Sequence, residues 1–250
     1  MNEIISVKQL SKSYGGWSAV EDLNLSVMQG TIFGLLGANG AGKSTTIECM
    51  LGTRRPDTGT VSILGMNPFL KRKQLFEHVG VQFQEANYQD KVTVAELCEV
   101  TQSLYRYAAD YGELLKKFGI SDKAKSMVKE LSGGQRQKLF IVLALIPQPK
   151  VVFLDELTTG LDVKARREVW EILSDLREKG LTIFLTSHFM DEVEALCDAI
   201  CILRKGKAVF CGTVKEAIAD SPYEKFEDAY LWYSDEEVSE NENISNNAEK

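Results

Sequence analysis

The 250-residue chain contains few of the residues that build zinc sites. It has two histidines and five cysteines, and the cysteines, at positions 49, 98, 197, 201 and 211, do not show metal-ligand spacing. We therefore expect no zinc site, and we expect reduced, buried cysteines of the kind found in cytosolic proteins. Cys197 and Cys201 stand four positions apart, but nothing else in the sequence favours a shared ligand role.

The sequence also lacks a long hydrophobic run. Its longest strongly apolar segment, Leu139 to Ile146, is far shorter than the roughly 20 residues that a membrane-spanning helix needs. The acidic start Met1-Asn2-Glu3 is not followed by an apolar stretch, so we expect no signal peptide. The sequence thus predicts a chain that does not cross a bilayer by itself.

An excess of positive charge is missing as well. The chain has 29 lysines and arginines against 36 aspartates and glutamates, a net charge of −7. Residues 224–250 hold nine acids and two bases, which is also −7, so residues 1–223 are neutral. This balance does not support nucleic-acid binding. In the acidic tail we expect a short helix over Phe226 to Tyr233 and disorder from Ser234 onward.

What the sequence does contain is a phosphate-binding loop. The stretch Gly37-Ala38-Asn39-Gly40-Ala41-Gly42-Lys43-Ser44 matches G-x-x-x-x-G-K-[ST] at every fixed position. Thr31 to Leu36 predicts a strand before it, and Thr45 to Leu51 predicts a helix after it. The glycines let backbone N–H groups approach an anion, and the helix start adds further donors. We expect Lys43 to reach the outer phosphates and Ser44 to bind Mg²⁺.

Local patterns predict shorter elements at both ends of the chain. Ile4 to Leu10 alternates enough to be a strand, and Tyr14 lies in a polar loop after it. Residues 199–204 and 207–211 predict a hairpin around Lys205-Gly206.

A helical lobe is predicted from residue 93. Thr93 resembles a helix N-cap, with Glu96 three residues later. Helical periodicity then runs past Tyr105 and again from Tyr111 to Phe118.

Two adjacent acids follow another apolar segment. Val151 to Leu154 shows no alternation, which is typical of a parallel strand buried on both faces. Asp155 and Glu156 come directly after it, and acids at the end of a buried strand are costly unless a cation or a reacting water uses them. We predict that Asp155 holds Mg²⁺ and that Glu156 orients and deprotonates the water that attacks the γ-phosphate.

The pentapeptide Leu131-Ser132-Gly133-Gly134-Gln135 resembles the signature of ATP-binding cassette (ABC) ATPases. The family's other motifs occur in its order and approximate spacing over about residues 3–215: Tyr14, Gly37 to Ser44, Gln84, Asp155-Glu156, Gly160-Leu161-Asp162 and His188. Leu157 stands where the family usually has proline, and Pro147 where it usually has a small or polar residue. Neither departure removes a catalytic group.

The resemblance implies a role for each matching position. Tyr14 resembles the aromatic residue that stacks on adenine, and residues Gly37 to Thr45 would hold the ATP phosphates. Gln84 resembles the glutamine that contacts Mg²⁺ or water and relays to a membrane partner. His188 resembles the histidine that contacts the γ-phosphate, and Asp162 the residue that communicates across a dimer.

The signature also implies an assembly. Ser132 to Gln135 is expected just before a helix, Arg136 to Leu145, so that it forms a second anion-binding helix start. In the family, this signature completes the ATP site of the opposite subunit. The resemblance therefore implies a head-to-tail homodimer with ATP and Mg²⁺ at the interface, and hydrolysis that depends on dimerisation.

The resemblance implies an α/β fold of the P-loop NTPase (RecA-like) type. We expect a mainly parallel sheet, an amino-terminal antiparallel β subdomain and an inserted α-helical subdomain. The predicted ABC ATPase domain covers residues 1–223, with a catalytic core at about 1–86 and 140–223 and a helical subdomain at about 87–139. Residues 224–250 form the acidic tail.

Three kinds of cassette ATPase are open to this chain. A transporter subunit would power a separate permease that docks on the lobe after Gln84, at the cytoplasmic face of the membrane. Ribosome-remodelling proteins usually carry two cassettes, and this chain has one. Chromosome or repair ATPases need a coiled-coil insertion, and the interval from Lys43 to Leu131 has no room for it. We expect a transporter subunit, with export favoured over import, because several phrases resemble bacterial drug, antibiotic or sodium exporters: Ala95 to Leu97, Asp155 to Asp162 and Phe226 to Tyr230.

Overall fold

The computed structural model describes residues 2–82, 91–156 and 158–234, which divide into two compact units. The first unit contains residues 2, 28–32 and the described part of 70–187, and the second contains residues 3–27, 33–69 and 188–234. The predictions made for Gln84, for Leu157 and for the tail beyond Ser234 lie outside the described residues. No helix in the described part of the chain is both long and apolar enough to span a membrane.

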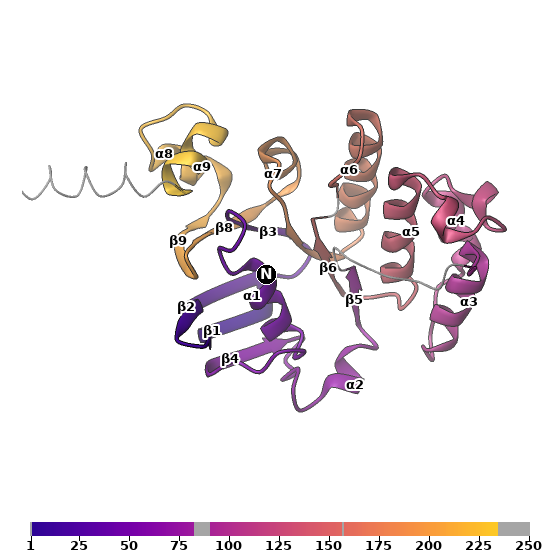
Figure 1. Ribbon diagram of the computed structural model, residues 1–250, viewed down its shortest axis with the longest axis horizontal. Helices are drawn as coiled ribbons and strands as arrows, with labels where there is room; N and C mark the ends of the chain where they lie inside the picture. The colour runs from indigo at the N-terminus through magenta and orange to yellow at the C-terminus, as the bar shows by residue number, and fades with distance from the viewer. Residues whose placement is uncertain (1, 83–90, 157, 235–250) are drawn as a thin grey trace, which may run out of the picture. The chain divides into compact units, whose positions relative to one another are not determined.

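The second unit begins with a three-stranded sheet in the order β2-β1-β4 (Figure 1). Its strands are β1 (Glu3–Tyr14), β2 (Trp17–Met28) and β4 (Thr58–Ile63), and β1 pairs antiparallel with β4. The expected strand at Ile4 to Leu10 is confirmed, but it is longer than predicted and Tyr14 is its last residue. The reason is the tight turn at Gly15 and Gly16, both at positive φ, which lets both strands run to its edge.

The same unit holds a second group of strands that ends at the carboxyl-terminal hairpin. The strand β3 (Ile32–Leu36) pairs in parallel with β8 (Ala199–Arg204), which pairs antiparallel with β9 (Lys207–Gly212), as the predicted hairpin requires. The helices are α1 (Lys43–Met50), α7 (Met190–Leu196), α8 (Val214–Ala219) and α9 (Phe226–Ser234). The predicted tail helix is confirmed, and its Phe226 is fully buried in a core shared with α7, α8 and β8.

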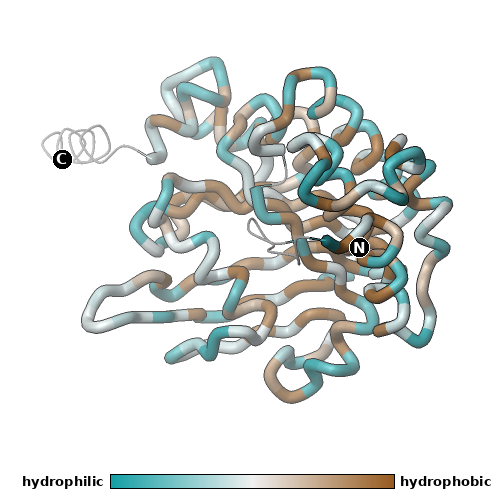
Figure 2. Tube along the Cα trace, turned by 45° about the vertical axis from the view of Figure 1, so that its right-hand side comes forward, coloured by the Kyte–Doolittle hydropathy of each residue, from teal (hydrophilic) through white to brown (hydrophobic). Residues whose placement is uncertain are grey.

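The first unit contains a parallel group of strands in the order β5-β6-β7. These are β5 (Val79–Gln82), β6 (Val151–Asp155) and β7 (Thr182–Thr186), and β6 is buried from Val151 through Leu154 as predicted. The long helices α5 (Gly133–Leu145) and α6 (Val163–Glu178) belong to this unit, and Figure 1 shows them side by side. Figure 2 shows the hydrophobic colour concentrated along the strands.

Shorter helices complete the first unit: α2 (Arg72–Leu75), α3 (Val94–Ser103), α4 (Tyr111–Lys117), and the 3₁₀ turns η1 (Ser121–Lys123) and η2 (Val128–Glu130). The predicted helix start at Thr93 is confirmed by a capping box in which Thr93 and Glu96 exchange side-chain bonds to backbone N–H groups. The expected helical pattern past Tyr105 is wrong. The backbone tightens where Leu104 and Tyr105 donate to carbonyls three residues back.

Candidate functional site

The phosphate-binding loop connects the fully buried β3 to α1 in the second unit. Gly42 has a φ of 105°, and a Cβ added there would lie 2.3 Å from the carbonyl oxygen of Ala19. A Cβ added at Gly37, φ 148°, would lie 2.6 Å from the carbonyl oxygen of Leu203. Both positions therefore require glycine, for backbone conformation and for space.

The lysine of the loop is held over the loop's own backbone. Lys43 is only 7% exposed, and its ammonium donates to the carbonyl oxygens of Gly37 at 2.7 Å and Ala38 at 3.2 Å. The next residue, Ser44, is exposed, and Thr45 is half-buried. A positive charge, an exposed hydroxyl and a helix start thus come together on one loop, which is the combination that binds phosphate.

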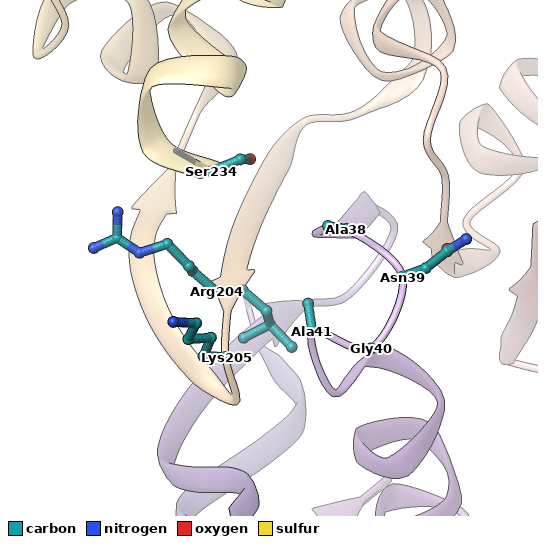
Figure 3. Close-up of a pocket in the computed structure, with 8 residues that line it drawn as sticks. Ala38, Asn39, Gly40, Ala41, Arg204, Lys205 and Ser234 are labelled. Carbon is teal, nitrogen blue, oxygen red and sulfur yellow. The ribbon is translucent and has the colours of Figure 1, made fainter. Parts of the chain in front are cut away.

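The turn of the β8–β9 hairpin is hydrogen-bonded to this loop. The N–H of Gly206 donates to the carbonyl oxygen of Ala41 at 3.0 Å. A cavity of about 210 Å³ lies between the loop, Ala38 to Ala41, and the segment Leu203 to Lys205, with Ser234 of α9 at its edge (Figure 3). Arg204 and Lys205 add positive charge beside an anion-binding loop. The sequence analysis missed this because it placed Arg204 at the end of a strand and Lys205 in a hairpin turn.

Tyr14 is half-buried at the end of β1. The Nζ of Lys12 and the Cζ of Arg54 each lie 5.5 Å from the centre of its ring, within the range of cation–π attraction. Lys12 also forms an ion pair with Asp57 at 2.7 Å, and this hydrogen bond holds the pKa of the Asp57 carboxyl below its usual range. The ring thus lies among charged neighbours at the end of a strand, and not in the polar loop that the sequence predicts.

The two acids lie in the first unit, where β6 and β7 end side by side. Asp155 and Thr186 are paired in the parallel register. The Thr186 hydroxyl donates to Oδ1 of Asp155, and its oxygen accepts the backbone N–H of Glu156 at 3.0 Å. The backbone N–H of Asp155 donates to Oε1 of Gln82, which is 4% exposed, at 3.1 Å. The hydroxyl of Thr186 and the side-chain amide of Gln82 thus fix the strand end that carries both acids.

Glu156 leaves the strand in an unusual conformation. Its φ is 48°, in the left-handed region, which costs a non-glycine residue on the order of 1–3 kcal/mol. The carbonyl oxygen of Glu156 accepts the N–H of Thr159 at 3.2 Å. The left-handed conformation of Glu156 coincides with the end of β6 at Asp155.

The signature lies at the amino terminus of α5. Ser132 caps this helix: its Oγ accepts the N–H of Gln135 at 3.2 Å, and the Gln135 side chain accepts the N–H of Ser132 at 3.1 Å. The helix was predicted to begin at Arg136, which is wrong, because the cap at Ser132 makes Gly133 the first helical residue. Ser132 and Gly133 are exposed.

A second helix start lies beside the signature. The exposed Asp162 caps α6 and accepts the N–H of Ala165 at 2.8 Å. A Cβ added at Gly134 would touch the Leu161 side chain at 3.6 Å, so the two helix starts are close neighbours. An ion pair between Lys138 and Glu168, 2.8 Å long, joins α5 to α6 further along.

The predicted site residues are thus divided between the two units. Gly37 to Thr45, Tyr14 and the exposed His188, whose ring centre is 4.2 Å from that of Phe189, belong to the second unit. The first unit carries the signature, Asp162 and both acids. The sequence analysis missed Thr186 and Gln82, although a polar residue that ends an apolar strand beside another such strand is a usable signal.

Comparisons with known proteins agree on one family. Residues 20–159 match a family model described as ABC transporter. The chain is 39% identical over 210 residues to the Nod factor export ATP-binding protein I of Burkholderia orbicola, covering 82% of this chain and 69% of that protein. It is 40% identical over 205 residues to the Mesorhizobium japonicum protein of that description, covering 80% and 60%. A solved structure of an ATP-binding subunit of an ABC transporter matches with a TM-score of 0.84 at 26% identity, over 92% of this chain and 99% of that one.

Proposed function

The chain belongs to the ABC transporter family, and from that premise we propose that it binds and hydrolyses ATP to power a separate membrane permease. The family and the P-loop fold predicted from the sequence are confirmed. The observation that carries the proposal is the phosphate loop, in which Lys43 is held by the carbonyls of Gly37 and Ala38 above a glycine-bounded turn. The triphosphate of ATP carries the negative charge that this loop can bind.

The residues fit a magnesium ion held mainly by the substrate. Among the described residues, no group of three or more histidines, cysteines or acids could hold a metal ion by itself. Mg²⁺ in nucleotide sites is usually bound by one or two protein oxygens together with phosphates and water. Ser44, Asp155 and Gln84 are the residues we assign to it, and the ion would neutralise charge on the phosphates. The Thr186 hydroxyl orients the Asp155 carboxylate for this task.

We assign the general base to Glu156. Its N–H is fixed by Thr186, and its left-handed backbone directs the chain away from β6. A carboxylate on a backbone fixed in this way can accept a proton from the attacking water, and a positioned base contributes roughly 10²–10⁴-fold to a rate. The exposed His188 is assigned to the γ-phosphate, and Tyr14 to the adenine ring.

The signature is proposed to act on a second copy of the chain. Ser132 and Gly133 are exposed at the start of the 13-residue helix α5, so this helix start is accessible to an anion from outside. Asp162, at the neighbouring start of α6, would lie at the same interface. We propose a head-to-tail homodimer in which Ser132 to Gln135 of one subunit close over ATP bound to the other.

Assembly is tested with the Glu156→Gln variant, which should bind ATP and hydrolyse it about 10²–10⁴-fold more slowly. We expect this variant with ATP to elute as a dimer, and the wild-type rate to rise more steeply than linearly with protein concentration. A rate that is linear in concentration, together with a monomeric variant in ATP, would contradict the proposed dimer.

We propose that the permease docks on the lobe after Gln84 and that the coupled transport is export. Large apolar side chains are exposed in and just after α3: Val100 is 59%, Leu104 70% and Tyr107 76% exposed. The direction is supported by the relatives, which are named as export ATP-binding proteins. The chain would then work at the cytoplasmic face of the membrane, where ATP is available.

The test pairs the chain with its permease in inverted membrane vesicles. We expect ATP-dependent uptake of the transported substrate into these vesicles, which corresponds to export from the cell. Leu104→Ser with Tyr107→Ser should abolish copurification with the permease while the isolated variant keeps its ATP affinity. Leu231→Ser, which removes a large apolar residue of α9 that is 57% exposed, is the matched control. Copurification that survives the double substitution would refute this docking surface, and substrate leaving the vesicles would refute export.

A further inference from the structure

Two cysteines face each other across the β8–β9 hairpin of the second unit. Cys201 and Cys211 are direct partners in the antiparallel register, and their Sγ atoms lie 2.7 Å apart. Residues directly opposed in an antiparallel pair have Cα atoms about 4.5–5.5 Å apart, inside the roughly 4.4–6.8 Å that a disulfide spans. A bond between them therefore needs no rearrangement of the backbone.

We propose that Cys201 and Cys211 form a dithiol site that a peroxide-class oxidant converts reversibly into an intrachain disulfide. The two thiols differ in access: Cys211 is exposed, whereas Cys201 has no exposed surface. An oxidant therefore reaches Cys211 first, while the buried Cys201 stays reduced beside it.

The acidities of the two thiols favour the same order. The hydrogen bond between the two thiols lowers the pKa of Cys211, whereas the same bond and burial raise the pKa of Cys201. Because the thiolate is the reactive form, Cys211 is the attacking thiol and Cys201 the resolving one.

The reaction balances in two steps. The Cys211 thiolate attacks one peroxide oxygen, so that an S–O bond forms, the O–O bond breaks, and the departing hydroxide takes up a proton to give water. The Cys201 sulfur then attacks the Cys211 sulfur, the S–O bond breaks, and the second hydroxide leaves with the Cys201 proton. Two thiols and one hydrogen peroxide thus yield one disulfide and two waters, with two electrons passing from sulfur to oxygen.

The other cysteines are poor competitors for the oxidant. Cys49 and Cys98 have no exposed surface, and burial raises the pKa of these thiols to about 11 and about 12. Burial also raises the pKa of the partly buried Cys197. The structure therefore confines rapid oxidation to the hairpin.

The site borders the phosphate loop. Cys201 is also paired with Leu35 of β3, two residues before Gly37, and the hairpin turn donates from Gly206 to Ala41. A disulfide would tie β9 to β8, the neighbour of β3, and restrain the hairpin whose turn is bonded to the loop. We expect slower amide hydrogen exchange over residues 199–212 in the oxidised chain.

The test treats the reduced full chain with a small excess of hydrogen peroxide, followed by thiol counting and peptide mass analysis. We expect the count to fall by two from five, the mass to fall by about 2 Da, and the melting temperature to rise by about 2–8 °C, all reversed by dithiothreitol. Cys211→Ser should lose this reaction, whereas the control Cys98→Ala should still lose two thiols.

Other products would overturn the proposal. A gain of about 32 Da on Cys211 without a disulfide would show overoxidation of an isolated thiol. Disulfide-linked dimers would show that the pair reacts between chains. Loss of two thiols in Cys211→Ser would place the reaction elsewhere.

Discussion

Thr186, the last residue of β7, donates its hydroxyl proton to the carboxylate of Asp155, the last residue of β6. The same oxygen accepts the N–H of Glu156, so one side chain positions the proposed magnesium ligand and the proposed base together. It acts through these two acids, and it is therefore a positioning residue.

We expect Thr186→Val to lower kcat by about 10–100-fold, because a hydrogen bond to a charged group is worth roughly 1.5–3 kcal/mol. The KM for ATP should change little, since the phosphate loop is untouched. Thr186→Ser keeps the hydroxyl and should restore most of kcat. Steady-state ATPase assays on the three proteins make the measurement, and wild-type turnover in the valine variant would remove Thr186 from the mechanism.

Because the backbone of Glu156 is strained, substitutions of this residue should change stability and activity in different ways. Glycine adopts a φ of 48° without penalty, so Glu156→Gly should raise the free energy of unfolding by up to about 1 kcal/mol while hydrolysis is lost. Glu156→Gln should lose hydrolysis without this gain, because it keeps the Cβ. Urea unfolding of both variants provides the comparison. A less stable glycine variant would show that the glutamate side chain contributes more to the fold than the strain costs.

Two glycines of the phosphate loop form a matched pair. A Cβ at Gly42 would lie 2.3 Å from the Ala19 carbonyl oxygen, whereas a Cβ at Gly40, also at positive φ, would meet no atom within 4 Å. Gly42→Ala should therefore abolish ATP binding and destabilise the chain by more than about 2 kcal/mol, and Gly40→Ala by only about 1 kcal/mol. Calorimetric ATP titration and thermal melts test this. Equal effects would mean that φ, rather than space, decides.

The oxidation rate of the hairpin dithiol should depend on pH in a defined direction. Below its pKa the Cys211 thiol is protonated and unreactive, and above it the thiolate reacts. Because the hydrogen bond with Cys201 lowers this pKa, the midpoint of the rate profile should lie below the usual thiol value of 9.0. In Cys201→Ala, the midpoint of the first oxidation at Cys211 should move upward. Stopped-flow thiol consumption measures both profiles, and identical midpoints would show that Cys201 does not act on Cys211.

The sequence by itself determined the features that are encoded in a few consecutive residues. The phosphate loop is one, since the glycines, Lys43 and Ser44 specify the backbone turn and its donors within eight positions. The cap at Thr93 and the hairpin at Lys205-Gly206 are others, because helix caps and tight turns are local. The signature identified the family, although its first helical residue depended on which group caps the helix.

Only the tertiary structure decided which distant residues meet. Thr186 reaches Asp155 across 31 positions and Gln82 reaches it across 73, because parallel strands joined through helices place residues from separate segments side by side. Arg204 and Lys205 approach the phosphate loop for a similar reason, since β8 pairs with β3. The exposure of Cys211 contradicts the expectation that all cysteines are buried. Composition could not reveal this, because the environment of a strand residue depends on what covers its face of the sheet.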